Sequence, residues 1–232
     1  MRYLSLIMLL MLTSASYAAR QDAIFAGGCF WCMQADFDKL AGVTQTIAGY
    51  DGGTLPNPTY EIVSGHDSGY SEVVKVSYDD SKVSYSQLVD YFLHHIDPTD
   101  AAGQFCDKGP QYTSKIFYLN EAQKQQATAQ LAIIKPQLKT VYTTILPSTK
   151  FYPAEEYHQD YKDKNTVRYN LYKEGSGRTG YVKETWSDTS LYVKEIFEDI
   201  KNFIIINNSS STKNMTVNNN VSWENFTSSM KE

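Results

Sequence analysis

Three features are scarce in this chain of 232 residues: cysteine, excess positive charge and long apolar runs. Its three cysteines, Cys29, Cys32 and Cys106, are too few and odd in number for a disulfide-stapled scaffold. The formal net charge of −5 gives no indication of binding to nucleic acid or to an anionic membrane surface. The apolar run over residues 4–12 is too short to span a bilayer comfortably. We therefore expect no stable membrane insertion of the mature protein.

The two ends of the chain differ from its middle. A basic start, the apolar residues 4–12 and the small residues that follow have the order of a secretory signal peptide cut after Ala18 or Ala19. Residues 1–19 thus predict an exported protein, periplasmic or secreted, with an uncleaved anchor as the alternative. Residues 187–232 predict an amphipathic helix over 190–205 and then a disordered tail rich in Asn, Ser and Thr. Residues 20–186 remain as one catalytic domain, long enough for a real core.

Within this domain, strand and helix patterns alternate loosely and without a repeat. We predict strands at residues 23–26, 43–50, 72–78, 112–119 and 141–146, and helices at 30–40, 57–65, 84–97, 121–134 and 151–161, the last with Pro153 in its first turn. The pattern favours an α+β class: a two-layer, mixed-sheet sandwich with a ferredoxin-like (α-β plait) core and an extra C-terminal helix.

The most informative segment is Gly28-Cys29-Phe30-Trp31-Cys32. It follows Gly27 and an apolar strand, so the order indicates a strand, a glycine turn and a cysteine at the start of a helix. Free N–H groups and the helix dipole favour a thiolate there, which makes Cys29 a candidate nucleophile. The C-x-x-C pair in an exported protein favours redox chemistry, and a buried structural cysteine is the alternative.

Glu72 is a carboxylate in an unusual place. Alternation along residues 72–78 puts it on the same face as Val74, Val76 and Tyr78. Burial on an apolar face disfavours the charged form and raises the pKa of a carboxyl toward the working pH. Such a group is a suitable proton donor.

Together these residues resemble the peptide-methionine (S)-S-oxide reductase family, methionine sulfoxide reductase type A, over about residues 22–186. Besides Gly28-Cys29-Phe30-Trp31, the resemblance rests on GYDGG (49–53), NPTY (57–60), DPTD (97–100), DKGPQY (107–112) and FYPAEEYH (151–158). It implies thiol-dependent reduction of the S epimer of methionine sulfoxide, free or in proteins, in the repair of oxidised proteins. It implies no cofactor and no metal.

The same resemblance implies the catalytic roles. Cys29 is the nucleophile that attacks the sulfoxide sulfur, and Glu72 is the acid that protonates the sulfoxide oxygen. Tyr60 and Tyr112 are hydroxyl donors to that oxygen, and Asp107 is a carboxylate behind them. Attack leaves a sulfenic acid on the cysteine and releases methionine.

Substrate binding and recycling involve further residues. The resemblance makes Gly28, Phe30 and Trp31 the substrate-binding residues, and Phe30 and Trp31 hold the substrate methyl group. Either Cys32, slightly favoured by its C-x-x-C spacing, or Cys106, beside the pocket, is expected to convert the sulfenic acid into a disulfide. Many family members use cysteines of a C-terminal tail, and this tail has none. A thioredoxin-like dithiol protein is the expected reductant, and the chain is expected to be a monomer.

One departure and two alternatives stay open at this point. The family usually has Gly-His-Ala-Glu where this chain has Gly69-Tyr70-Ser71-Glu72. A C-x-x-C pair after a strand also fits a thioredoxin-like disulfide oxidoreductase, and the cysteines alone fit a non-enzymatic module that binds metal or thiols. The consecutive His94 and His95 point in different directions on a helix, so their spacing does not favour a metal site.

Overall fold

The computed structural model describes residues 20–65 and 68–186. The predicted signal peptide (1–19) and the predicted C-terminal extension (187–232) lie outside the described residues. Within the described ranges, none of the helices combines the length and the apolar character needed to cross a membrane.

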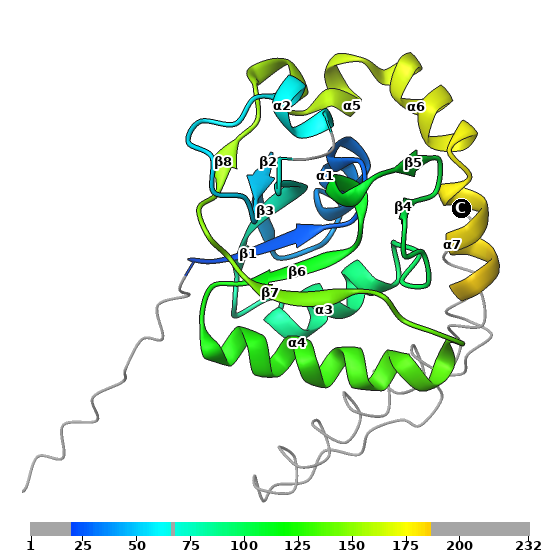
Figure 1. Cartoon of the computed structure of the whole chain (residues 1–232). Helices are drawn as coiled ribbons and strands as arrows, with labels where there is room; N and C mark the ends of the chain where they lie inside the picture. The colour runs from blue at the N-terminus through cyan, green and yellow to red at the C-terminus, as the bar shows by residue number, and fades with distance from the viewer. Residues whose placement is uncertain (1–19, 66–67, 187–232) are drawn as a thin grey trace, which may run out of the picture. The chain divides into compact units, whose positions relative to one another are not determined.

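A six-stranded mixed sheet forms the centre of the fold (Figure 1). Its strands are β1 (Arg20–Ala26), β2 (Val43–Asp51), β3 (Ser71–Asp79), β6 (Lys115–Tyr118), β7 (Thr144–Pro147) and β8 (Tyr152–Pro153). They lie in the order β7-β6-β1-β3-β2-β8, and every neighbouring pair is antiparallel except β6 and β7. The short strands β4 (Gly103–Gln104) and β5 (Asp107–Lys108) form a separate hairpin. The predicted α+β class with a mixed sheet is confirmed.

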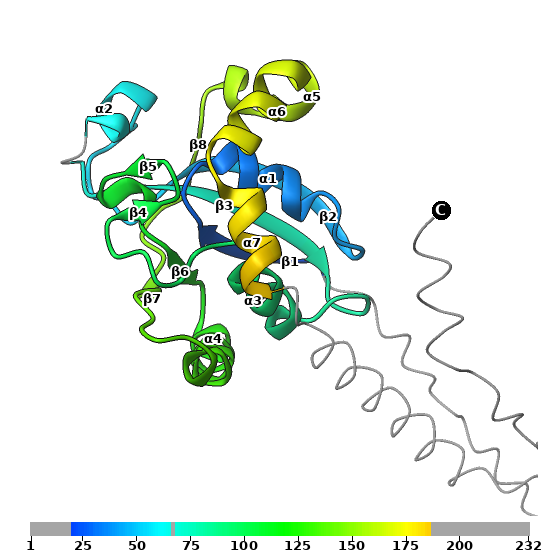
Figure 2. The ribbon, with the colours of Figure 1, turned by 90° about the vertical axis from the view of Figure 1, so that its right-hand side faces the viewer.

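Seven α-helices and three 3-10 turns lie within the described residues. The helices are α1 (Phe30–Phe37), α2 (Tyr60–Ser64), α3 (Tyr85–Leu93), α4 (Glu121–Ile134), α5 (Tyr161–Lys164), α6 (Thr166–Gly175) and α7 (Arg178–Trp186). The 3-10 turns are η1 (Pro110–Tyr112), η2 (Lys135–Gln137) and η3 (Glu156–His158). Figure 2 shows α7 in front of the sheet, beside α1 and α3. The predicted capping box of Ser84 and Gln87 is present at the start of α3.

Alternation along β1 separates the two faces of the sheet. Phe25 belongs to the main core, where its ring stacks on Phe37 of α1 and on Phe92 of α3, each at 5.1 Å between ring centroids. Ile24 belongs to a smaller cluster with Phe117 of β6. Helices α1 and α3 therefore cover one face of β1, and this packing holds the start of α1 against the end of the strand.

The predicted helix over residues 151–161 is wrong. Tyr152 and Pro153 form the edge strand β8, which pairs with Tyr50 and Gly49 of β2. Helical structure in this stretch is limited to the turn η3 and the start of α5. Proline has no N–H to donate, so it is tolerated at a sheet edge as well as in a first helical turn. Local spacing could not distinguish these two positions.

Helices α6 and α7 are missing from the sequence-based prediction. An amphipathic helix is recognised by an apolar stripe that faces a core. In α6 two apolar side chains face outward instead, since Val167 is 75% exposed and Leu171 is 73% exposed. The apolar spacing of α6 therefore does not follow a single buried face, and the sequence pattern does not reveal the helix. Both α6 and α7 nevertheless supply residues next to Cys29 and Cys32.

Candidate active site

Cys29 lies at the junction between β1 and α1, as predicted. It is the N-cap residue of α1, and its C=O accepts the N–H groups of Cys32 at 3.2 Å and Met33 at 3.3 Å. Gly28 before it has a φ of +81°, and an added Cβ there would come within 2.5 Å of Cβ of Gln104. The turn therefore requires glycine at position 28.

The sulfur of Cys29 is buried, with 6% of the residue exposed. Burial raises the pKa of the Cys29 thiol well above its ordinary value, and its hydrogen bond to Cys32 and the nearby Glu72 act in the same direction. Burial thus disfavours the thiolate that the helix N-terminus is expected to favour on Cys29. The surrounding cluster contains Cys29, Cys32, Ala35, Tyr161 and Tyr169, with Trp31 and Tyr172 packed against it.

Cys32 shows the opposite shift. The hydrogen bond from Cys29 lowers the pKa of Cys32, and the positive charges of Arg178 and Lys173 lower it further, against the effect of burial. Of the two cysteines, the second one of the C-x-x-C pair therefore loses its proton more readily.

Glu72 lies on β3, opposite Tyr50 of β2, and is 3% exposed. Its Oε2 accepts the backbone N–H of Phe30 at 3.0 Å, so the carboxyl reaches the first turn of α1 beside Cys29. Burial raises the pKa of Glu72 to about 8, although the hydrogen bonds from Phe30 and Tyr112 act in the opposite direction. At neutral pH this carboxyl is mostly protonated and can donate a proton.

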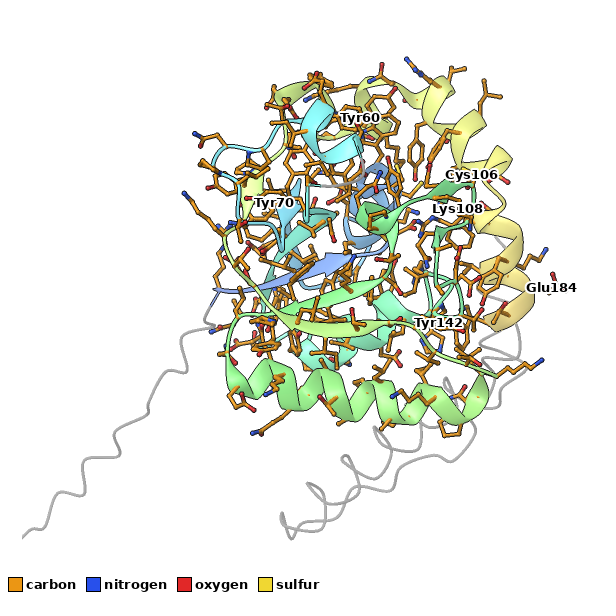
Figure 3. The ribbon with its side chains drawn as sticks, viewed as in Figure 1. Tyr60, Tyr70, Cys106, Lys108, Tyr142 and Glu184 are labelled. Atoms are coloured by element: carbon orange, nitrogen blue, oxygen red, sulfur yellow. The ribbon has the colours of Figure 1, made fainter. Side chains whose placement is uncertain are left out.

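The two predicted hydroxyl donors come from separate elements and meet at Glu72. Tyr60 begins α2, where Figure 3 labels it, and Tyr112 ends the turn η1. The hydroxyl of Tyr112 hydrogen bonds with that of Tyr60 and with the carboxyl of Glu72. Burial raises the pKa of Tyr60 and of Tyr112, which keeps both hydroxyls protonated as donors.

Tyr60 is held in place by Glu155, a residue of the matched segment 151–158 to which the sequence analysis gave no role. Glu155 accepts the backbone N–H of Tyr60 at 2.8 Å through one carboxylate oxygen and the hydroxyl of Tyr50 at 2.8 Å through the other. The carboxylate thus connects the start of α2 to β2. The matched segment 151–158 contains this residue, but nothing local indicated which groups its carboxylate holds.

Asp107 and Cys106 lie on the hairpin of β4 and β5. The carboxylate of Asp107 accepts a hydrogen bond from the hydroxyl of Tyr172 on α6, which also lies within hydrogen-bonding reach of Cys29. Cys106 is exposed at the turn of the hairpin (Figure 3), whereas Cys32 is fully buried. The structure thus brings Asp107 to Cys29 through Tyr172, a residue that sequence reasoning missed because it lies on α6.

The aromatic residues after Cys29 are fixed by contacts from the C-terminal part of the domain. Trp31 stacks on Tyr161 at 3.7 Å between ring centroids, and its Nε1–H donates to Nδ1 of His158 at 3.0 Å. Phe30 lies 4.9 Å from the His158 ring. Burial lowers the pKa of His158, which keeps the ring neutral and Nδ1 free to accept. These contacts give both aromatic side chains a single orientation.

Tyr70 stands where the resembled family usually has histidine. It is 3% exposed, and its hydroxyl donates to the backbone C=O of Leu55. A Cβ at Gly53 would meet its ring at 2.2 Å, so the ring lies directly against that glycine. Tyr70, labelled in Figure 3, therefore holds the segment that leads from β2 into α2. No group of three or more His, Cys, Asp or Glu within residues 20–65 and 68–186 could hold a metal ion.

Comparison with known sequences identifies one family. The family described as "Peptide methionine sulfoxide reductase" matches residues 21–190. The chain is 45% identical over 179 residues to peptide methionine sulfoxide reductase MsrA 2 of Rhizobium meliloti, covering 77% of this chain and 89% of the relative. It is 48% identical over 178 residues to MsrA/MsrB of Vibrio cholerae, where the match covers 74% of this chain but only 46% of that longer protein.

Solved structures agree with the sequence comparison. Methionine sulfoxide reductase A of Corynebacterium diphtheriae is similar with a TM-score of 0.62 and 30% identity, over 66% of this chain and 78% of that one. Mxr1 of Saccharomyces cerevisiae in reduced form is similar with a TM-score of 0.61 and 32% identity, over 64% of this chain and 87% of that one. Both matches favour the reductase over the thioredoxin-like and metal-binding alternatives.

The raised pKa of Glu72 makes the stability of the protein depend on pH. The folded state keeps the Glu72 proton up to about pH 8, whereas the unfolded chain releases it near the ordinary value. The native state therefore binds more protons in this window, and wild-type stability falls as pH rises through it. We expect Glu72→Gln to gain stability relative to the wild type by a few kcal/mol across this window, because a tenfold change in proton affinity corresponds to about 1.4 kcal/mol.

Urea denaturation at a series of pH values measures this difference. The matched control is Glu121→Gln, because Glu121 is an exposed carboxylate on α4 and its replacement should follow the wild-type curve. Parallel stability curves for Glu72→Gln and the wild type would mean that Glu72 is ionised in the native protein.

Proposed function

This chain belongs to the peptide methionine sulfoxide reductase family, and on that premise we propose that it reduces the S epimer of methionine sulfoxide, free or in proteins, to methionine. The observation that carries the proposal is the hydrogen bond of 3.0 Å from the N–H of Phe30 to Oε2 of Glu72. It joins a protonated carboxyl to the helix that begins at Cys29. A proton donor and a sulfur nucleophile are thus available to one bound sulfoxide group.

The first step transfers oxygen from the substrate to the protein. The sulfur of Cys29 attacks, the substrate S–O bond breaks, and Glu72 delivers its proton to the oxygen, which remains on Cys29 as a sulfenic acid. The substrate leaves as methionine. Tyr112, whose hydroxyl hydrogen bonds with Glu72, and Tyr60, whose hydroxyl hydrogen bonds with that of Tyr112, donate hydrogen bonds to the oxygen as negative charge develops on it. Phe30 and Trp31 hold the methyl group.

The second step forms a disulfide, and we assign the resolving role to Cys32. Its sulfur hydrogen bonds with Cys29 inside one apolar cluster, and its lowered pKa makes it the better nucleophile. Attack on the sulfenic acid forms the S–S bond and releases the oxygen as water. Cys106 is exposed and hydrogen bonds with the hydroxyl of Tyr172, which also reaches Cys29, so it is the second candidate.

Regeneration completes the cycle. The disulfide between Cys29 and Cys32 has to be reduced by thiolate exchange, and we propose a thioredoxin-like dithiol protein as the reductant. Export through the signal peptide of residues 1–19, repair of oxidised proteins outside the cytoplasm and a monomeric state belong to the same proposal. The order β6-β1-β3-β2 supports a ferredoxin-like plait as the core of the sheet.

The activity is tested with racemic methionine sulfoxide and dithiothreitol. We expect methionine to form from the S epimer alone, because a site with fixed aromatic side chains and fixed oxygen donors accepts one arrangement of the groups at sulfur. Chiral chromatography of the remaining sulfoxide measures the selectivity, and Cys29→Ser is the inactive control. Loss of neither epimer in the presence of the folded protein would refute the proposal.

A second prediction concerns the proton that Glu72 supplies. Glu72→Gln keeps the shape of the side chain and cannot donate an acidic proton. We expect it to slow methionine release in a single turnover by about 10²- to 10⁴-fold. Rapid-quench measurement of methionine checks this rate, with Glu156→Gln, an exposed carboxylate of η3, as the control. An unchanged rate would remove Glu72 from the mechanism.

A third prediction concerns the resolving cysteine. After one turnover without reductant, we expect peptide mapping to find a disulfide between Cys29 and Cys32 in the wild type and in Cys106→Ser. Cys32→Ser should still release one methionine per protein but leave a sulfenic acid that a dimedone probe labels. A disulfide between Cys29 and Cys106 in the wild type would instead give the resolving role to Cys106.

A further inference from the structure

Arg178 is a buried cation at the start of α7. It is 3% exposed, and its guanidinium donates to the backbone C=O groups of Gly27 and His95, each at 2.7 Å, and to Sδ of Met33 at 3.4 Å. It also lies over the ring of Phe105 at 4.5 Å. All these neighbours are uncharged. Among the described residues, no carboxylate forms an ion pair with Arg178.

A buried guanidinium without a counter-charge is unfavourable, because burial removes the water that would otherwise solvate it. The contacts of Arg178 place it at the segment that carries the two cysteines. Gly27 begins the turn that carries Cys29, and Met33 directly follows Cys32 on α1. The guanidinium therefore lies against the segment that carries both sulfurs, and its positive charge acts on Cys32.

The other charged groups near Cys32 do not replace Arg178. Lys173 of α6 also favours a thiolate, but its Nζ is paired with Asp36 at 2.9 Å. Asp36 also forms an ion pair with Lys39 at 2.9 Å, and its negative charge disfavours a thiolate on Cys32. Glu72 and Tyr169 also interact with Cys32, and burial raises the pKa of both, which keeps them uncharged at neutral pH. Arg178 is thus the cation near Cys32 that lacks a carboxylate partner.

We propose that Arg178 is the counter-cation of a resting Cys32 thiolate, and that this thiolate removes the proton of Cys29 as Cys29 attacks the substrate. The inference rests on the proposed function and extends it to a base that the reaction needs. Cys29 and Cys32 share a hydrogen bond within one buried cluster, so the proton has a direct path between the two sulfurs. Arg178 acts here as a positioning residue, through Cys32.

The proton transfers balance without an external acid or base. At rest, Cys29 carries its thiol proton, Cys32 is a thiolate and Glu72 is protonated. In the first step Cys32 takes the Cys29 proton, Cys29 forms the S–O bond, and the Glu72 proton passes to that oxygen. In the second step Cys32 gives its proton to the hydroxyl oxygen of the sulfenic acid, its thiolate attacks the Cys29 sulfur, and that oxygen leaves as water. A disulfide, a carboxylate on Glu72 and one water remain.

Thiolate titration tests the resting charge without any need for turnover. All variants carry Cys106→Ser, which removes the exposed thiol. We expect the ultraviolet thiolate absorbance at neutral pH to persist in Cys29→Ser, whose hydroxyl can still donate to Cys32, and to vanish in Cys32→Ser. The opposite result, with the neutral-pH thiolate lost in Cys29→Ser and kept in Cys32→Ser, would overturn the proposal.

The role of Arg178 is tested in the Cys29→Ser, Cys106→Ser background. We expect Arg178→Gln to raise the titration midpoint of Cys32 by about one pH unit or more, which is about a tenfold loss of thiolate near neutral pH. Arg178→Lys keeps the charge and should restore most of the thiolate. Arg168→Gln, an exposed arginine on α6, is the control and should change nothing. An unchanged midpoint in Arg178→Gln would refute the role of Arg178.

Single-turnover kinetics link the charge to the reaction. In the full chain with both reactive cysteines, Arg178→Gln should slow methionine release about tenfold at neutral pH. The rate should recover as the pH is raised through the new titration midpoint of Cys32. A purely structural defect would not recover with pH. If Arg178→Gln does not fold, the two cysteine variants still show which sulfur is the thiolate, and Arg178→Lys still tests whether Arg178 affects the titration midpoint of Cys32. If the wild type forms no methionine, the proposed function is refuted. The thiolate titration still tests the charge on Cys32 in that case, because it does not depend on turnover.

Discussion

Desolvation of the groups around Cys29 is the constraint on which the rest of the site depends. The same burial that makes the surroundings of the sulfur apolar raises the pKa of Cys29 and of Glu72 together. Both groups therefore hold a proton at neutral pH. In the proposed mechanism one of these protons passes to the sulfoxide oxygen, and the other leaves before the sulfur attacks. We propose that Cys32, one helical turn from Cys29 and close to the buried guanidinium of Arg178, receives that second proton.

The arrangement needs contributions from the whole length of the domain. The end of β1 and the start of α1 carry the sulfurs, and β3 carries the acid. The segments after β8 complete the site: Glu155 anchors Tyr60, His158 orients Trp31, Tyr172 contacts Asp107, and Arg178 lies against the glycine turn. Helices α6 and α7 have little apolar surface of their own to bury. Their contacts with the site therefore also help to hold these two helices on the domain.

The chain departs from the resembled family in two ways that the structure relates to its own chemistry. The predicted tail has no cysteine, and the C-x-x-C pair places two sulfurs, which we propose as the redox couple, within one turn at the start of α1. Tyr70, which replaces the usual histidine, has a hydroxyl that hydrogen bonds with the backbone of the segment leading into α2. This hydrogen bond thus helps to place Tyr60 through the backbone that leads into α2.

The sequence by itself determined the parts of the protein that depend on local pattern. Strand alternation put Glu72 on the apolar face, and the glycines before Cys29 required a turn into a helix, because side-chain periodicity and backbone freedom are properties of a few adjacent residues. Only the tertiary structure decided which sulfur carries the proton, where Pro153 lies and which residues of α6 and α7 reach the site. Burial and Coulomb interactions depend on groups distant in the chain, such as Arg178 and Cys32, and no local pattern records how close folding brings them.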